Sequence, residues 1–139
     1  MRVVIDTNVF VSSFFGGLPR KVLDLFRDGA LTLCLSGAIL DEYAEVLSRL
    51  GLAQGPELTE LLSFLAHAQN TLFVADPQPV RAIPEDPDDD KFVACALALD
   101  APCVVTGDKA MLAVARFHQV RILSPREFLE LSGRSVTFP

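Results

Sequence analysis

The chain lacks a long hydrophobic run, a block of basic residues and a leader-like start. No apolar stretch approaches the roughly 18 residues of a membrane-spanning helix, and the start, Met1–Asp6, has the pattern of a strand rather than a signal peptide. These absences predict a cytoplasmic protein with no membrane partner. The formal net charge of −6 argues against a protein that coats nucleic acid, because such proteins are normally basic.

Cysteine and histidine are also scarce. The cysteines, Cys34, Cys95 and Cys103, are odd in number, form no Cys-x-x-Cys pair and lie in apolar segments, which predicts buried, inert thiols. Neither His67 nor His118 has an acid or a cysteine at ligand spacing. No Ser-His or Cys-His pair is visible, so covalent catalysis has little support.

Apolar strands that alternate with helical patterns make up the rest of the sequence. The length of 139 residues, half of them apolar, predicts a single domain spanning residues 1–139. Near-continuous apolar strands separated by helices indicate a parallel sheet covered on both faces, a three-layer α/β/α fold. We predict strands at 2–6, 31–35, 71–74, 103–106 and 120–123, and helices at 19–28, 37–50, 57–69, 88–99, 109–116 and from 125 onward.

Acidic residues recur where the predicted strands end or the helices begin. Asp6 closes the first strand, Asp108 follows strand 103–106, and Asp89 stands at the start of an apolar helix. In neighbouring parallel strands these carboxylates meet at the C-terminal edge of the sheet, where open α/β sheets bind ligands. Because a group of carboxylates without a compensating arginine repels itself, the pattern predicts a divalent metal site.

Helical geometry selects one acid from helix 37–50. Glu42 falls three residues after Ile39 and four before Val46, at the edge of the buried face, whereas Asp41 and Glu45 project from the far side. A glutamate at the edge of a core needs a partner to offset its desolvation. We therefore expect Glu42 to belong to the site.

The same geometry favours Asp89 over Asp90. Asp89 is in line with Phe92 and Val93 on the apolar face, whereas Asp90 points about 100° away and Lys91 points outward. Asp90 remains open as an outer or water-bridged ligand, and a swapped assignment of the two acids also remains open.

Two polar residues flank the strand-end aspartates. Asn8 and Thr106 are each placed to hydrogen-bond a carboxylate and fix its orientation, as metal sites require. For each of them a turn-stabilising role is an equal alternative. The acids have local alternatives too, since Asp6 fits an Asx-turn and Asp108 a helix N-cap.

Four blocks of the sequence carry most of these acids and their neighbours. In chain order they are Val3-Val4-Ile5-Asp6-Thr7-Asn8-Val9, Ile39-Leu40-Asp41-Glu42-Tyr43, Asp86-Pro87-Asp88-Asp89-Asp90-Lys91-Phe92 and Val105-Thr106-Gly107-Asp108. Together they resemble the PIN-domain ribonucleases, and among these the VapC-like toxin components of toxin–antitoxin pairs. The resemblance covers nearly the whole chain.

The resemblance implies a five-stranded parallel sheet of order 3-2-1-4-5 and an acidic pocket that binds Mg²⁺ or Mn²⁺. The family's four acids map onto Asp6, Glu42, Asp89 and Asp108, and for Glu42 and Asp89 this agrees with the choice made by helical geometry. The run at 88–90 leaves the register of the third acid open by one residue.

These patterns predict a divalent-metal-dependent ribonuclease with RNA as its substrate and, by the resemblance, an antitoxin partner. A homodimer is expected, with the apolar stretch 9–15 and the helix around 58–65 as candidate interfaces, although both fit a core equally well. Two alternatives remain: an aspartyl-phosphate phosphatase or receiver-like domain that uses Asp6, and a non-catalytic, metal-dependent binding module.

Overall fold

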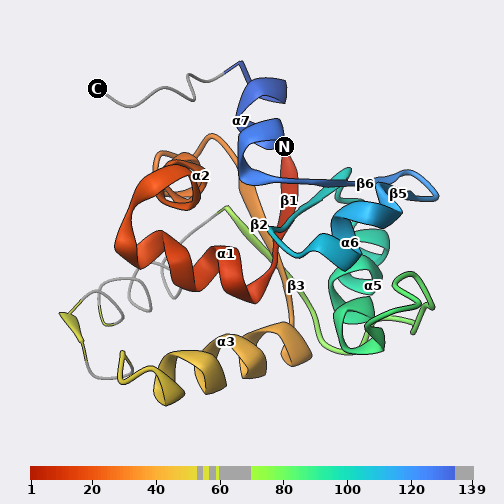
Figure 1. The fold of residues 1–139 in the computed structure, drawn as a ribbon, viewed down its shortest axis with the longest axis horizontal. Helices are drawn as coiled ribbons and strands as arrows, with labels where there is room; N and C mark the ends of the chain where they lie inside the picture. The colour runs from red at the N-terminus through yellow and green to blue at the C-terminus, as the bar shows by residue number, and fades with distance from the viewer. Residues whose placement is uncertain (53–54, 57–58, 60–69, 134–139) are drawn as a thin grey trace.

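A six-stranded sheet runs through the centre of the computed structural model, which describes residues 1–52, 55–56, 59 and 70–133 (Figure 1). The strand order is β3-β2-β1-β4-β6-β5, and all neighbouring pairs are parallel except β5 with β6. The strands are β1 Arg2–Ile5, β2 Thr32–Ser36, β3 Thr71–Val74, β4 Cys103–Val105, β5 Arg116–Phe117 and β6 Val120–Leu123.

Five of these strands confirm the predicted parallel order, and the sixth was not predicted. The chain bends at Ala115 and His118, both of which have positive φ, so that β5 turns back and pairs antiparallel with β6. The bend at Ala115 also ends helix α6 at Val114, two residues before the end predicted from sequence. A two-residue strand is too short to leave an alternating pattern in the sequence.

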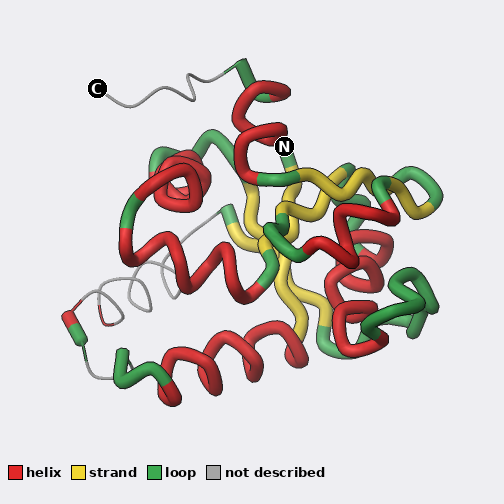
Figure 2. Tube along the Cα trace, viewed as in Figure 1, coloured by secondary structure: helices red, strands yellow, loops and turns green. Residues whose placement is uncertain are grey.

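Helices cover both faces of the sheet, as the three-layer prediction required (Figure 2). In Figure 1, α1 and α2 lie to the left of the strands and α5 to the right. The helices are α1 Thr7–Ser12, the 3₁₀ turn η1 Ser13–Phe15, α2 Gly17–Arg27, α3 Gly37–Arg49, the 3₁₀ turn η2 Pro87–Asp89, α5 Asp90–Ala98, α6 Lys109–Val114 and α7 Pro125–Leu131.

Helix α1 was not predicted, because its β-branched and aromatic residues carry no helical signal of their own. Its side chains Val9, Phe10 and Val11 are buried, so this part of the 9–15 stretch belongs to the core. Phe15, in η1, is 73% exposed. The other interface candidate, around 58–65, and the predicted helix 57–69 fall mostly outside the described residues.

Capping residues in the sequence correctly predicted where helices α3 and α7 begin and, to within one residue, where α3 ends. The Ser36 hydroxyl accepts a hydrogen bond from the backbone N–H of Ile39 at the start of α3. Ser124 and Glu127 form the predicted capping box of α7. Helix α3 ends at Arg49, and Gly51 then takes the left-handed conformation, at φ +74°, that glycine adopts at low cost.

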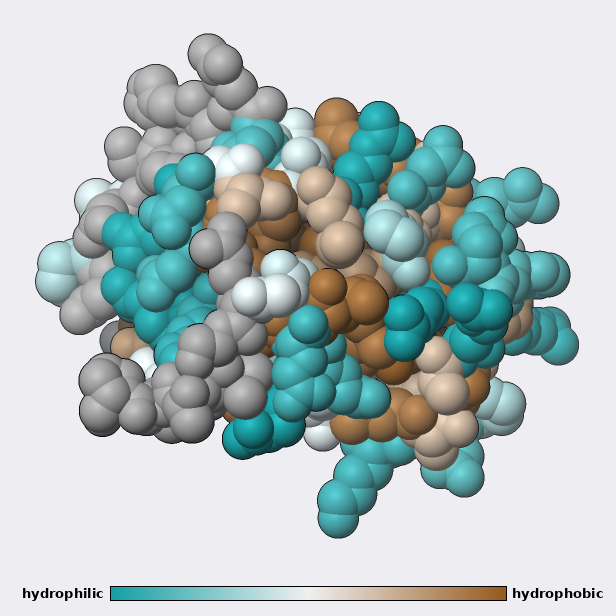
Figure 3. All heavy atoms as spheres, turned by 90° about the horizontal axis from the view of Figure 1, so that it is seen from above, coloured by the Kyte–Doolittle hydropathy of each residue, from teal (hydrophilic) through white to brown (hydrophobic). Residues whose placement is uncertain are grey.

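The core forms between the sheet and its covering helices. β1 and β4 are buried along almost their whole length, and the three cysteines are buried free thiols, as predicted. On the face seen from above, some hydrophobic residues reach the surface between polar ones (Figure 3). Among the described residues no helix is long and apolar enough to cross a membrane.

Candidate active site

Asp6 lies at the carboxyl end of the central strand β1, at the N-cap of α1. The strand register pairs Ile5 with Val105, so the next residue on each strand, Asp6 and Thr106, face each other. Oδ1 of Asp6 accepts a hydrogen bond of 2.9 Å from the backbone N–H of Val9, and Oδ2 accepts one from the Thr106 hydroxyl. Asp6 is only 3% exposed, so both oxygens are fixed in a largely dry setting.

Asp108 follows β4 in the loop that leads to α6 and, like Asp6, is the N-cap of the next helix. It caps α6, since its Oδ2 accepts a 3.0 Å hydrogen bond from the N–H of Met111. Its own N–H donates to the hydroxyl of Thr106, which in turn donates to Asp6. Thr106 therefore connects the two strand-end aspartates, an arrangement that matches the orienting role considered for it.

Asp89 lies at the end of η2, immediately before α5, rather than inside the first helical turn. Pro87 is the first residue of this 3₁₀ turn, and the turn removes Asp89 from the helical geometry that we used to select it. Burial, followed by repulsion from Asp86 and Asp108, raises the pKa of Asp89 from 3.8 to about 7. Asp86 is thus an additional acid beside the site, one that we did not select from the sequence.

Asp90 makes a different set of contacts. Its Oδ1 accepts hydrogen bonds from the backbone N–H groups of Ala82, at 3.0 Å, and Ile83, at 2.7 Å. These bonds anchor the proline-rich segment between β3 and η2 to the start of α5. The geometry favours a structural role for Asp90 and leaves Asp89 as the better candidate for the third ligand.

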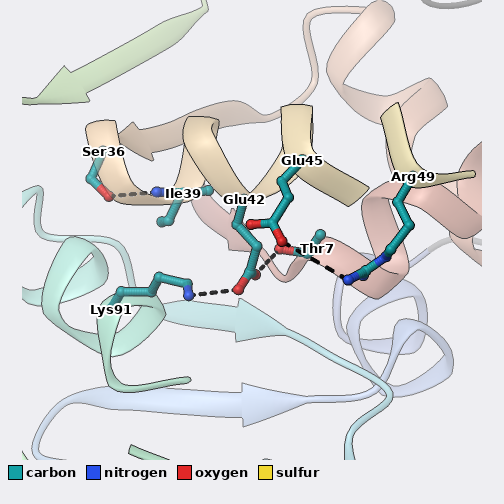
Figure 4. A network of polar contacts seen from close by, with 7 residues as sticks. All are labelled: Thr7, Ser36, Ile39, Glu42, Glu45, Arg49 and Lys91. Carbon is teal, nitrogen blue, oxygen red and sulfur yellow. Dashed lines mark hydrogen bonds and ion pairs between the residues drawn. The ribbon is translucent and has the colours of Figure 1, made fainter. Parts of the chain in front are cut away.

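Glu42 has the partner that its half-buried position required (Figure 4). Its Oε1 lies 2.6 Å from the Nζ of Lys91, and its Oε2 accepts a hydrogen bond from the hydroxyl of Thr7. Lys91 was expected to point outward, which is wrong: its side chain turns to α3 and is 22% exposed. Helical projection could not find this pair, because it depends on how α3 and α5 pack.

The acids influence one another electrostatically. Burial is the main cause of the raised pKa of Asp6, to which the charges of Asp108 and Glu42 add. Asp6 and Asp108 likewise both raise the pKa of Asp89. The charges of Asp6, Asp89 and Asp108 therefore act on one another in all three pairings, as is expected of carboxylates that share one region of the sheet edge.

The chemistry of this donor set suits a hard divalent cation. Mutually repelling carboxylates are stabilised by such an ion, and oxygen is the ligand that Mg²⁺ and Mn²⁺ prefer. Within the described residues no three acid, histidine or cysteine side chains are yet grouped closely enough to hold a metal. Ligation at this edge thus calls for the carboxylates to turn toward a shared ion.

A cavity of about 480 Å³ adjoins Asp108. The exposed residues Asn8 and Ser12 of α1 line it on one side and Lys109 on another, while Pro19 and Pro125 supply apolar surface. Asn8 thus faces the space beside Asp108. The cavity offers amide, hydroxyl and ammonium groups next to a carboxylate, a combination suited to a polar, negatively charged ligand.

Two further residues support the site without a clear signal in the sequence. The hydroxyl of Tyr43 donates a hydrogen bond to the carbonyl oxygen of Ile5, the residue before Asp6, and its ring stacks on Phe10 at a centroid distance of 4.0 Å. Thr7 holds Glu42. Only the position of Thr7, next to Asp6, marked it in the sequence.

A parallel α/β sheet with acids at its carboxyl edge defines a class of ligand-binding domain, and comparison with known proteins is more specific. Residues 2–110 match the PIN domain family. The chain is also similar to an uncharacterized protein of Methanocaldococcus jannaschii, MJ1680. The two are 30% identical over an alignment 142 residues long, which covers 94% of this chain and 90% of the relative.

The chain therefore belongs to the PIN-domain family, as its sequence motifs predicted. PIN domains are generally nucleases that bind divalent metals, so membership supports a hydrolase that acts on a nucleic acid. The match contains the four proposed acids and Thr106.

Proposed function

We propose that this protein is a divalent-metal-dependent ribonuclease that hydrolyses RNA phosphodiester bonds at the edge of the sheet where β1 and β4 end. The observation that carries the proposal is the convergence of Asp6, Asp89 and Asp108 from three separate segments of the chain on one region. Membership of a nuclease family supplies the class of reaction.

The proposed ligands of the cation are Asp6, Asp89 and Asp108. Thr106 orients two of them, because its hydroxyl is bonded to Asp6 and to the backbone N–H of Asp108. A bound Mg²⁺ or Mn²⁺ would supply Lewis acidity toward the phosphate and lower the pKa of water. Glu42 lies near these three acids, where its charge contributes to the raised pKa of Asp6.

The cavity beside Asp108 is the proposed seat of a nucleotide next to the scissile phosphate. Lys109 meets backbone phosphate there, Asn8 faces a base or a 2′-hydroxyl, and the rings of Pro19 and Pro125 offer apolar contact. A protein with a net charge of −6 needs such local cations to hold a polyanion.

An aspartyl-phosphate mechanism fits the structure poorly. A nucleophilic Asp6 would need an accessible oxygen, yet both its oxygens accept hydrogen bonds and the residue is 3% exposed. The position two residues later, where such phosphatases usually carry a second aspartate, is Asn8. The absence of a trapped acyl-phosphate at Asp6 would agree with the ribonuclease proposal.

The toxin role belongs to this proposal as well and rests on the resemblance of the sequence motifs to VapC-like proteins. In that role, a cognate antitoxin binds the ribonuclease and keeps it inactive until the antitoxin is removed. The ribonuclease itself acts as a homodimer. Growth arrest on expression of the wild-type chain, relieved by Asp6→Asn, is the expected outcome in cells.

The test of the proposal is cleavage of a mixed RNA pool with Mg²⁺ or Mn²⁺. The wild type is compared with Asp6→Asn, Asp89→Asn and Asp108→Asn, each of which keeps the shape of the side chain and removes its charge. We expect cleavage by the wild type and a loss of about 100-fold or more in each variant, as for removal of a charge-stabilising group. Undiminished cleavage by Asp6→Asn would contradict the proposal.

A further inference from the structure

The ion pair between Lys91 and Glu42 joins two helices next to the acidic region. Lys91 stands two residues after Asp89 at the start of α5, and Glu42 lies on α3 with Thr7 as its second partner. Glu42 is close enough to Asp6 to raise its pKa. An ammonium group is thus held within the acidic region, between the segments that carry Asp6 and Asp89.

The contacts of Glu42 count against a direct bond to metal. Its Oε1 lies 2.6 Å from the Lys91 ammonium and its Oε2 accepts a hydrogen bond from Thr7, and of these two contacts it is the cation that opposes a metal ion. A divalent ion on either oxygen would lie within a few ångströms of the Lys91 ammonium and be repelled by it. Asp6, Asp89 and Asp108 have no such cationic partner in the contacts that the structure describes.

The ammonium itself retains binding capacity. Lysine carries three N–H donors, and the bond to Glu42 uses one of them. The side chain is 22% exposed, so it reaches solvent, and its Nζ lies 5.5 Å from the centroid of the Phe92 ring, which limits its movement. A positioned cation with free donors beside carboxylates is suited to a phosphate oxygen.

We propose that Lys91 binds a phosphate of the RNA substrate and that Glu42 holds Lys91 in place instead of ligating the metal. This inference rests on the proposed ribonuclease function. Glu42 is then a positioning residue, which fixes the cation that offsets phosphate charge next to the acids. The pair lets an acidic protein accept RNA at the site without a basic surface.

The first experiment measures RNA binding without cleavage. Single-stranded RNA with a fluorescent label is titrated with Asp6→Asn protein in EDTA at several salt concentrations, followed by anisotropy. The plot of log K for binding against log salt concentration has a negative slope, and adding Lys91→Met should make it shallower by about 0.7, the value for one phosphate contact on a single strand. The same substitution should weaken binding about five-fold near about 0.1 M salt. Lys91→Arg should restore most of the slope.

The matched control is Arg49→Met in the same background. Arg49 pairs with Glu45 on the same helix as Glu42, at 3.9 Å, but both side chains are well exposed. The Arg49→Met substitution removes one positive charge, as Lys91→Met does, and should leave the salt dependence of RNA binding unchanged. A lysine with only a structural role would lower the melting temperature in Lys91→Met without changing the slope, and that outcome would overturn the proposal.

The second experiment addresses Glu42 through metal binding. Free Mn²⁺ is measured by electron paramagnetic resonance during titration of the wild type, Glu42→Gln and Asp108→Asn. We expect Asp108→Asn to weaken Mn²⁺ binding about ten-fold or more and Glu42→Gln to weaken it less, because only a charge near Asp6 is lost and not a ligand. Equal losses in the two variants would make Glu42 a ligand and overturn its positioning role.

The two levels of failure are distinguishable. If the wild type cuts RNA but Lys91→Met keeps the full salt slope, the inference about Lys91 is wrong and the ribonuclease proposal stands. If the wild type neither cuts RNA in the presence of Mn²⁺ nor binds RNA, the ribonuclease proposal fails, and the inference about Lys91 fails with it.

Discussion

The hydroxyl of Thr106 donates a hydrogen bond to Oδ2 of Asp6 across 100 residues of sequence. The hydroxyl oxygen of Thr106 also accepts a 3.0 Å hydrogen bond from the backbone N–H of Asp108. One buried hydroxyl, on a residue with no exposed surface, thus sets the relative positions of two proposed metal ligands.

Thr106→Val tests this link. Valine keeps the shape of the side chain but leaves Oδ2 of Asp6 without its hydroxyl partner in a buried site, which should cost about 1–3 kcal/mol of unfolding free energy. Denaturant unfolding measures the loss, and cleavage of RNA should fall with it. Thr106→Ser keeps the hydroxyl and should retain more activity than Thr106→Val; equal activity in the two would contradict an orienting role.

The pKa of Asp89, raised to about 7, predicts a pH-dependent stability in metal-free protein. Between its unfolded pKa of 3.8 and its folded pKa, the folded chain binds a proton that the unfolded chain releases. The stabilising contribution is therefore complete below about pH 4 and is lost as the pH rises through about 7.

Asp89→Asn should remove this part of the dependence. The difference in melting temperature between wild type and variant, measured in EDTA from about pH 4 to about pH 8, should shift in favour of the variant as the pH rises. Mg²⁺ should reduce the difference, because a bound cation favours the ionised carboxylate. A difference that stays constant with pH would show that Asp89 is not perturbed.

Asp90 should separate stability from activity. Asp90→Ala removes the acceptor of the Ala82 and Ile83 N–H groups and should destabilise the fold by about 1.5–3 kcal/mol, the range for hydrogen bonds to a charged group. Asp90→Asn keeps an acceptor oxygen and should cut RNA better than Asp89→Asn. A dead Asp90→Asn beside an active Asp89→Asn would reverse the assignment of the third ligand.

Tyr43 offers a test of the support beneath Asp6. Tyr43→Phe removes the hydrogen bond to the Ile5 carbonyl but keeps the ring that stacks on Phe10, so the expected loss is about 1 kcal/mol. Tyr43→Leu also loses the stacked ring and should cost more. Equal unfolding free energies for the two variants would mean that the hydroxyl carries the whole effect.

Much of the fold could be predicted because its signals are local. The apolar runs of β1 and β4 mark buried parallel strands, and the cap residues Ser36 and Ser124 need only residues three positions away. The misses also have physical causes. The apolar side chains of α1 obtain their helical conformation from packing in the core, and β5 exists only because the chain reverses at Ala115 and His118.

The sequence by itself determined that Asp6 and Asp108 stand at strand ends, since a strand followed by a capping acid is a local pattern. The tertiary structure alone decided the partners of the other acids: Lys91 and Thr7 for Glu42, and the Ala82 and Ile83 amides for Asp90. Such contacts depend on how helices and loops distant in sequence pack together. Helical periodicity describes one element at a time and cannot specify that packing.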